Sequence, residues 1–489
     1  MTKENKFLIL ITAIPLLIIF LAFFNPDYGG LVRKSIPVFA IVSIPYCLSV
    51  RDPRNGLILF LLEASLLEGP WKNFSYGMSL KWLVYIIRDL LLYATFLNFL
   101  KSKKRLLSRD VLRQHPPFTG IILIYVLNII IQILNPYNFN HTSAIAGSRM
   151  FWEMLPLYWM GFYLMREKRS FKILFMLCLL CGFLNSVTTI LQYVWGKAKV
   201  SLICEGYSVM IFKWGRGLGK TLRPPGLGPD MGFGGMYIAQ TITMLITLFI
   251  LKASEKQKKG PLLLAGLIAL GIINLAGLIA SASRSAMVLS FILLIVFIFA
   301  RKELIRKRPL KIFIFLVLLF SLIMPYLFNS FKMAAKRYET VKSPVVLLRT
   351  IAETEKDRWE QSFVLPFRYS VKFFLGNGLG KVGPGAGLFS EGKVGQINAE
   401  NTINLSLAEI GTIGTLLWIL FHIVIIKRGF HNFIHIKDPE LKWYVAVPFT
   451  YMISALTFWQ FNQLIVFPQN AAFWFMSGIL MGAAYIKDL

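Results

Sequence analysis

The chain is poor in acidic residues and in cysteine. Its 489 residues include 24 Asp and Glu against 53 Lys and Arg, a formal net charge of +29, and only 4 cysteines. No Asp-x-Asp pair occurs, which argues against a metal site for a nucleotide sugar. Cys178 and Cys181 lie in an apolar run without a second pair, and Cys204 has no evident partner. We therefore expect no metal, no cofactor and no disulfide framework.

Long apolar runs dominate what remains. Hydrophobic residues make up 56% of the chain and the mean hydropathy is +0.61. The runs are continuous and long enough to cross a bilayer at about 1.5 Å per residue. The sequence predicts an all-α polytopic membrane protein with about 12–14 transmembrane helices and no cleavable signal peptide. The candidate spans are 7–24, 36–50, 56–70, 80–100, 117–135, 150–165, 171–196, 231–251, 260–281, 284–300, 310–328, 402–426, 442–460 and 467–486.

The basic residues indicate the orientation of these spans. With the N-terminus inside, dense basic clusters follow the even-numbered spans, as at 101–113, 252–259, 301–308 and 427–428. This pattern obeys the positive-inside rule and places both termini in the cytoplasm of a bacterial inner membrane. The net charge then reflects topology and attraction to the lipid surface, and nucleic acid is not an expected partner.

This topology divides the chain into four regions. They are N-terminal helices (1–196), helices with an outer basic loop (197–328), one large extracytoplasmic loop (329–402) and C-terminal helices (403–489). Within the large loop, 353–365 has the pattern of an amphipathic helix that Pro366 would break or kink. The glycines from Gly376 to Gly387 suggest a mobile cover over an extended substrate, and a simple flexible linker is the alternative.

Several arginines lie on the predicted outer side, where the positive-inside rule does not explain them. Arg216 and Arg223 belong to the outer basic loop, Arg284 stands between two apolar spans, and Arg149 lies at the outer end of the sixth span. They could be solvated or could extend to lipid headgroups. The alternative is a site for a phosphate-bearing ligand, which suits the bidentate fork of arginine.

Four segments resemble the O-antigen ligase and bacterial polysaccharide polymerase superfamily. They are RPPGLGPDMGFGGMYIA (223–239), SASRSAMVLSFILLI (281–295), DRWEQSF with FFLGNGLG (357–380) and ENTINLSLAEIGTIG (400–414). The resemblance implies a metal-independent membrane glycosyltransferase that takes a glycan from undecaprenyl pyrophosphate on the outer face of the membrane. The other partners it implies are a second lipid-linked glycan as acceptor, the bilayer, and a chain-length regulator or flippase of the same pathway.

The resemblance also suggests roles for individual residues. Arg223 and Arg284 would hold the pyrophosphate and stabilise its charge as the glycosidic bond breaks, with Arg216 and Arg149 as additional candidates. Glu400 would act as general base and Asn401 would orient the attacking hydroxyl. Arg358 in the large loop, and Glu409 more than two turns into the span that follows it, would have supporting roles.

One departure from the family bears on the reaction. Ligases of this family carry a histidine where this chain has Glu400, and none of its five histidines lies in the large loop. A carboxylate can serve as base if burial raises its pKa, although an acid in the first turn of a helix also has a purely structural explanation. We therefore favour a polymerase over a ligase. The alternatives from other classes are a lipid-linked oligosaccharide flippase, against which the lack of an internal repeat argues, and a structural subunit of a capsule assembly complex.

Overall fold

The computed structural model describes most, but not all, of the chain. The described residues are 52–76, 81–106, 115–138, 140–215, 219–228, 233–254, 260–300, 364–382, 401–457 and 467–486, with the isolated positions 17, 21, 29, 30, 32, 360 and 399. The chain forms two compact units, each made of two stretches. Unit 1 comprises 1–109 and 169–339, and unit 2 comprises 110–168 and 340–489.

The first part of unit 1 is a helix interrupted by a π-helical turn. It runs through α3 (Pro53–Leu62), η2 (Glu63–Leu67) and α4 (Glu68–Phe74), and α5 (Lys81–Leu106) packs beside α3. Asp52 caps α3 by accepting a hydrogen bond from Arg54 N at 3.0 Å. A Cβ on Gly56 would lie 2.7 Å from Thr95 Oγ1, so this glycine allows α3 and α5 to approach closely.

The second part of unit 1 contains longer helices and one short hairpin. It consists of α10 (Lys168–Ile203), α11 (Glu205–Ile211), β1 (Phe212–Gly215), β2 (Gly219–Leu222), α12 (Phe233–Ser254), α13 (Gly260–Ala280) and α14 (Arg284–Ala300). The two strands are antiparallel. In α10 the helix is kinked at Gly196, whose φ is +64°.

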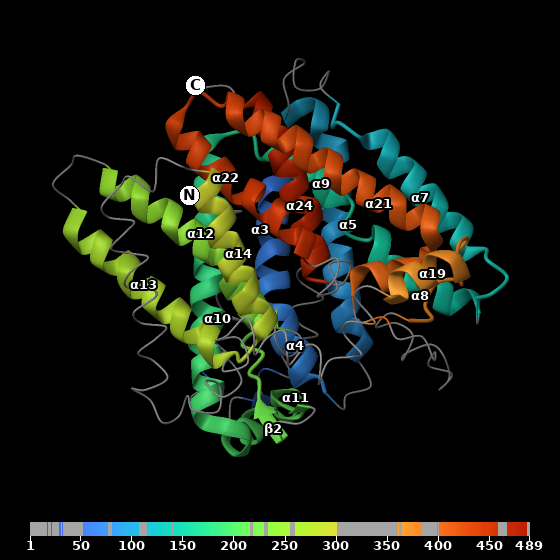
Figure 1. Cartoon of the computed structure of the whole chain (residues 1–489). Coiled ribbons are helices and arrows are strands. Elements are labelled where there is room, and N and C mark those ends of the chain that lie inside the picture. The colour runs from blue at the N-terminus through green and yellow to red at the C-terminus, as the bar shows by residue number, and fades with distance from the viewer. Residues whose placement is uncertain are drawn as a thin grey trace. The chain divides into compact units, whose positions relative to one another are not determined.

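A buried carboxamide joins α10, α12 and α13. These three helices are labelled in Figure 1. Asn274 of α13 accepts hydrogen bonds through Oδ1 from Ser186 of α10 at 3.1 Å and from Thr241 of α12 at 3.3 Å. All three side chains are buried. Interhelical polar contacts of this kind, together with small residues, are typical of helices that associate within a membrane.

In unit 2, α9 and α24 pack very closely. This unit begins with α7 (Thr119–Ile133), α8 (His141–Trp152) and α9 (Pro156–Leu164), and α24 (Gln469–Gly482) lies against α9. Cβ atoms on Gly478 and Gly482 would collide with the carbonyl oxygens of Tyr158 and Phe162, respectively. Glycines four residues apart on one helix face allow such contact between backbones.

The rest of unit 2 is organised around one long helix. It comprises α19 (Leu365–Lys372), α21 (Thr402–His435), α22 (Pro439–Ser454) with the 3-10 turn η7 (Ala455–Thr457), and η8 (Ala483–Tyr485) after α24. α21 packs against α7, α19, α22 and α24.

These elements confirm a predominantly helical fold. Two described helices, Lys168–Ile203 and Thr402–His435, are long and apolar enough to cross a membrane, and three shorter apolar helices are 119–133, 234–249 and 265–280. The predicted span 150–165 is wrong as one continuous helix, because the chain turns at 153–155 between α8 and α9. Three predicted spans, 7–24, 36–50 and 310–328, lie wholly or almost wholly outside the described residues.

Candidate functional site

In unit 1, the segment that carries Arg223 is anchored to α10 by two carboxamides. Gln192 donates from Nε2 to Gly226 O and accepts from Gly226 N, both at 2.9 Å, and Asn185 Oδ1 accepts from Leu227 N at 3.0 Å. Gly226 has a φ of +63°, and a Cβ there would lie 2.6 Å from Thr189 Oγ1. The glycine of this Arg-x-x-Gly segment is therefore required by both backbone conformation and space.

The segments that carry Arg223 and Arg284 meet at the first turn of α12. A Cβ on Gly234 would collide with Pro225 O, two residues after Arg223. A Cβ on Gly235 would lie 2.6 Å from Ser281 Oγ and 3.1 Å from Ala286 Cβ, on either side of Arg284 in the sequence. Two of the four segments singled out in the sequence thus converge within unit 1, and α12 and α14 both begin there.

This end of the helices has the features of an anion site. The unsatisfied N–H groups and the dipole at a helix N-terminus favour negative charge, and here two helices begin beside two arginine positions. Arg223 is half-buried. Arg284 is the first residue of α14, although its side chain lies outside the described part, as does all of Arg216.

In unit 2, the other two segments also meet, at a break in α21. Gly411 has φ +73° and ψ 179°, which divides α21 into a short helix before it and a long helix after it. The residues 374–382, which we call the glycine strap, lie across this break. Thr412 N donates to Phe374 O at 3.0 Å, and Asn377 N donates to Ala408 O at 2.9 Å. The strap thereby satisfies backbone groups that the broken helix leaves open.

The glycine strap is also bound to the end of α7 by carboxamide side chains. Gln132 Nε2 donates to Leu375 O at 2.5 Å, and Asn138 Oδ1 accepts from Leu379 N at 2.8 Å. Gly376, Gly378 and Gly380 all have positive φ, between +73° and +92°. These three glycines are therefore fixed by their contacts, and neither a mobile cover nor a flexible linker describes them. Gly383, Gly385 and Gly387 lie outside the described residues.

Glu409 links the helix to the far end of the strap. Its side chain is buried, and Oε1 accepts a hydrogen bond from Val382 N at 2.8 Å. Burial lowers the pKa of the neighbouring Lys381. Since Gly411 follows two residues later, Glu409 lies at the end of the short helix rather than deep within a continuous span.

The start of α21 is fixed by Asn401. This residue is buried, and its Oδ1 accepts from Asn404 N at 2.8 Å, which is the capping bond of the helix. The carboxamide oxygen of Asn401 is therefore engaged in holding the helix start. Glu400, the predicted base, lies next to this cap but outside the described residues, and so does Arg358.

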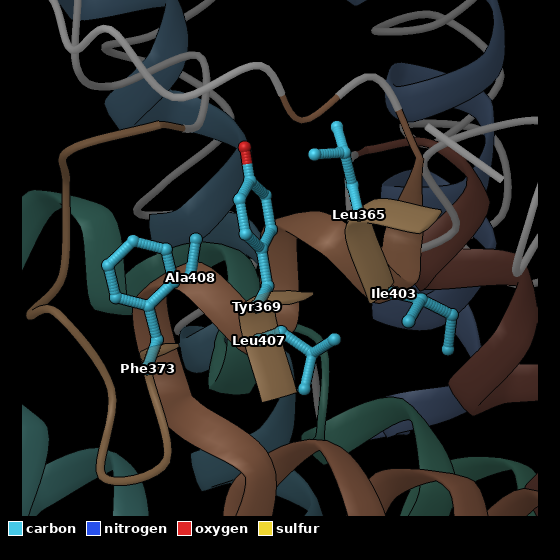
Figure 2. Packing of buried hydrophobic residues seen from close by; sticks show 6 residues of the cluster. All are labelled: Leu365, Tyr369, Phe373, Ile403, Leu407 and Ala408. Carbon is cyan, nitrogen blue, oxygen red and sulfur yellow. The ribbon is translucent and has the colours of Figure 1, made fainter. Parts of the chain in front are cut away.

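A small apolar cluster packs α19 onto the short helix of α21. Figure 2 shows its six side chains, which come from α19, the residue after it, and the turns of α21 before the break. They are Leu365, Tyr369, Phe373, Ile403, Leu407 and Ala408. Pro366 lies in the first turn of α19. A residue without a backbone N–H does not destabilise the helix there, because the first turn offers that N–H no acceptor within the helix. The predicted amphipathic helix 353–365, which Pro366 was expected to break or kink, lies mostly outside the described residues.

Arg149 is placed differently from the other candidate arginines. It lies in α8 of unit 2, half-exposed, with Nε 3.4 Å from Glu153 Oε2. Arg223 and Arg284 belong to unit 1. The guanidinium of Arg149 thus already has a carboxylate partner one helical turn away.

Sequence reasoning missed a charged cluster buried in unit 1. Arg88 of α5 contacts Glu68 Oε1 and Asp89 Oδ1, each at 3.0 Å, and all three side chains are almost fully buried. Glu63 is completely buried in the π-helical turn, where Tyr237 donates from its hydroxyl to Ala64 O at 2.9 Å. Ionisable residues within apolar spans are rare and usually paired. The presence of Glu63 and Glu68 in the predicted span 56–70 was therefore the sequence feature that could have indicated this cluster.

Comparison of the chain with protein-family models, curated proteins and solved structures finds no match.

Proposed function

We propose that this protein is a membrane-embedded glycosyltransferase that polymerises undecaprenyl-pyrophosphate-linked glycan repeat units on the outer face of the bacterial inner membrane. The observation that carries this proposal is the convergence of the Arg223 and Arg284 segments on the first turn of α12. Phosphate recognition needs cations and hydrogen-bond donors in one place, and this end of unit 1 gathers two arginine positions and two helix N-termini.

The direction of the helices is consistent with this site facing outward. In unit 1, α12 and α14 begin at the end where α13 finishes, and the basic run 252–259 follows α12 at its other end. In unit 2, the glycine strap lies at the end of α7 and near the beginning of α21. The first turns of α12 and α14 and the glycine strap thus belong to segments that the positive-inside rule assigns to the exterior, and the run 252–259 belongs to one that it assigns to the cytoplasm.

The proposed reaction is a single displacement at the anomeric carbon. Arg223 and Arg284, with Arg216, would hold the donor pyrophosphate and stabilise the charge that accumulates as the glycosidic oxygen–carbon bond breaks. Glu400 would accept the proton of the attacking sugar hydroxyl. Asn401 would fix the position of Glu400 by capping α21. Glu409 and the glycine strap would keep this part of unit 2 folded.

The test is glycan synthesis by the purified full-length protein in detergent, from a lipid-linked donor and without a membrane gradient. We expect Arg223→Gln to lower the rate by about 10²–10³-fold, which is typical for loss of one fixed donor to a developing anion. The matched control is Lys199→Gln, an exposed cation in the same predicted outer loop. Equal activity of both variants and the unaltered protein would refute the arginine site, and a flippase would form no product at all.

The size of the surface polysaccharide separates a polymerase from a ligase. Deletion of the gene should leave single repeat units if the protein is a polymerase. Long chains retained on undecaprenyl would instead indicate a ligase. Glu400→Gln is a separate test of the base, because full activity under single-turnover conditions would remove Glu400 from the mechanism and leave the arginine site standing.

A further inference from the structure

A polar pocket of about 400 Å³ lies in unit 2 at the C-terminal end of α21. Its walls are the last turns of α21, the loop into α22, and residues 483–486 after α24. The charged and titratable side chains that line it are Arg428, His431, His435, Lys437, Asp438 and Tyr485. The sequence places this end of α21 on the predicted cytoplasmic side, remote along the helix from the glycine strap.

The single carboxylate of this pocket is already engaged. Asp438 Oδ1 caps α22 by accepting from Glu440 N at 2.8 Å and Leu441 N at 3.2 Å, and Oδ2 forms an ion pair with Lys168. Within the described part of the chain, no carboxylate forms an ion pair with Arg428 or Lys437. The pocket therefore holds two permanent cations whose charge the described protein does not balance.

Two histidines add polar ring nitrogens to the same wall. His435 Nδ1 lies 2.7 Å from His431 O, and a ring nitrogen facing a carbonyl oxygen must carry the proton. The other nitrogen of that ring, Nε2, is then the lone-pair nitrogen of the neutral imidazole, and it accepts a hydrogen bond, for example from a protonated phosphate oxygen. The ring centroids of His431 and His435 are 4.3 Å apart, and both residues line the pocket. Both side chains are exposed.

We propose that this pocket binds a phosphate group. Arginine offers a planar fork that matches two phosphate oxygens, and lysine supplies a further charged donor. The phosphate could belong to a phospholipid headgroup or to a soluble compound. This site is independent of the proposed glycan chemistry.

The experiment measures binding to the purified full-length protein in a zwitterionic detergent. One arm titrates short-chain phosphatidylglycerol and the other titrates inorganic phosphate, with short-chain phosphatidylcholine as the neutral lipid. Arg428→Gln should weaken binding about tenfold or more, because a charge-assisted hydrogen bond is lost. Lys427→Gln is the matched control. Lys427 is the preceding residue, is exposed, carries the same charge, and does not line the pocket.

The two arms distinguish the source of the phosphate. Tight binding of phosphatidylglycerol with weak displacement by inorganic phosphate indicates a lipid headgroup, and the reverse order indicates a soluble phosphate compound. Lys437→Gln repeats the test on an exposed loop residue, so a folding defect in one variant does not decide the result. Absence of binding by both probes, or an equal loss in Lys427→Gln and Arg428→Gln, would overturn the proposal in favour of a diffuse surface charge.

Discussion

Replacing Gly411 with alanine should detach the glycine strap from α21. Gly411 has φ +73° and ψ 179°, a backbone conformation that essentially only glycine adopts. A Cβ at this position would lie 2.6 Å from the carbonyl carbon of Leu375 and 2.8 Å from Phe374 O. These are backbone atoms of the strap, so no side-chain rotation relieves the collision.

The expected loss of stability follows from two contributions. Backbone strain of this type costs about 1–3 kcal/mol. Displacing the strap would also break the hydrogen bonds from Thr412 N to Phe374 O and from Asn377 N to Ala408 O, and each buried group left without a partner costs about 1–3 kcal/mol. We therefore expect Gly411→Ala to lower the free energy of unfolding by about 3–9 kcal/mol.

The assay is thermal unfolding of the purified protein, compared with Gly120→Ala as control. Gly120 lies in α7 of the same unit, and a Cβ there meets nothing within 4 Å. This control should be neutral or slightly stabilised, since alanine is favoured over glycine in a helix by about 0.5–1 kcal/mol. Gly411→Ala should unfold at least 6 °C lower, at about 2–4 °C per kcal/mol for a unit of this size. Equal midpoints for the two variants would refute the strap geometry.

Four further substitutions test other parts of the fold. Glu68→Gln should lower the free energy of unfolding by about 3–5 kcal/mol, because it weakens a buried ion pair with Arg88. Glu63→Gln should leave the free energy of unfolding unchanged, since Glu63 accepts no hydrogen bond from the described residues. Equal effects of the two substitutions in chemical denaturation would contradict this difference. Gly478→Leu should separate α24 from α9 and lower the unfolding temperature, by an overpacking cost of about 1–3 kcal/mol or more. Asn138→Ala should cost about 1–3 kcal/mol by leaving Leu379 N without its acceptor, and faster proteolysis within the strap would reveal it.

The helices could be predicted from the sequence where apolar runs were long. The predicted spans 80–100, 260–281 and 284–300 correspond closely to α5, α13 and α14. The prediction failed at 150–165, where an equally apolar run turns at 153–155. Hydropathy measures the apolar content of a run and not the continuity of its hydrogen bonds, so a break of three residues leaves little trace.

The candidate site was predictable in its residues but not in its contacts. The glycines and Glu409 stood out in the sequence, yet nothing marked Gln132 or Asn138 as their partners, because these lie more than 240 positions away from the strap they bind. Single carboxamides at the end of an apolar run are ordinary. Their role depends on a tertiary contact, and one sequence carries no record of which distant backbone groups need a donor or an acceptor.

The contacts in unit 2 also change what the resemblance to polysaccharide polymerases can support. Glu409, Gly411 and Gly414 are each required locally, since Glu409 binds Val382 N, Gly411 allows the break, and a Cβ on Gly414 would lie 2.9 Å from Asn128 Nδ2. A protein with another activity that closes a loop over a broken helix would need the same three residues. The glycosyltransferase proposal must therefore depend on Arg223 and Arg284, because an arginine at the start of α14 has no comparable requirement in the backbone. If Arg223→Gln abolishes glycan transfer and leaves the stability unchanged, Arg223 acts in the reaction. If it lowers both transfer and stability, the result supports only a structural role for Arg223.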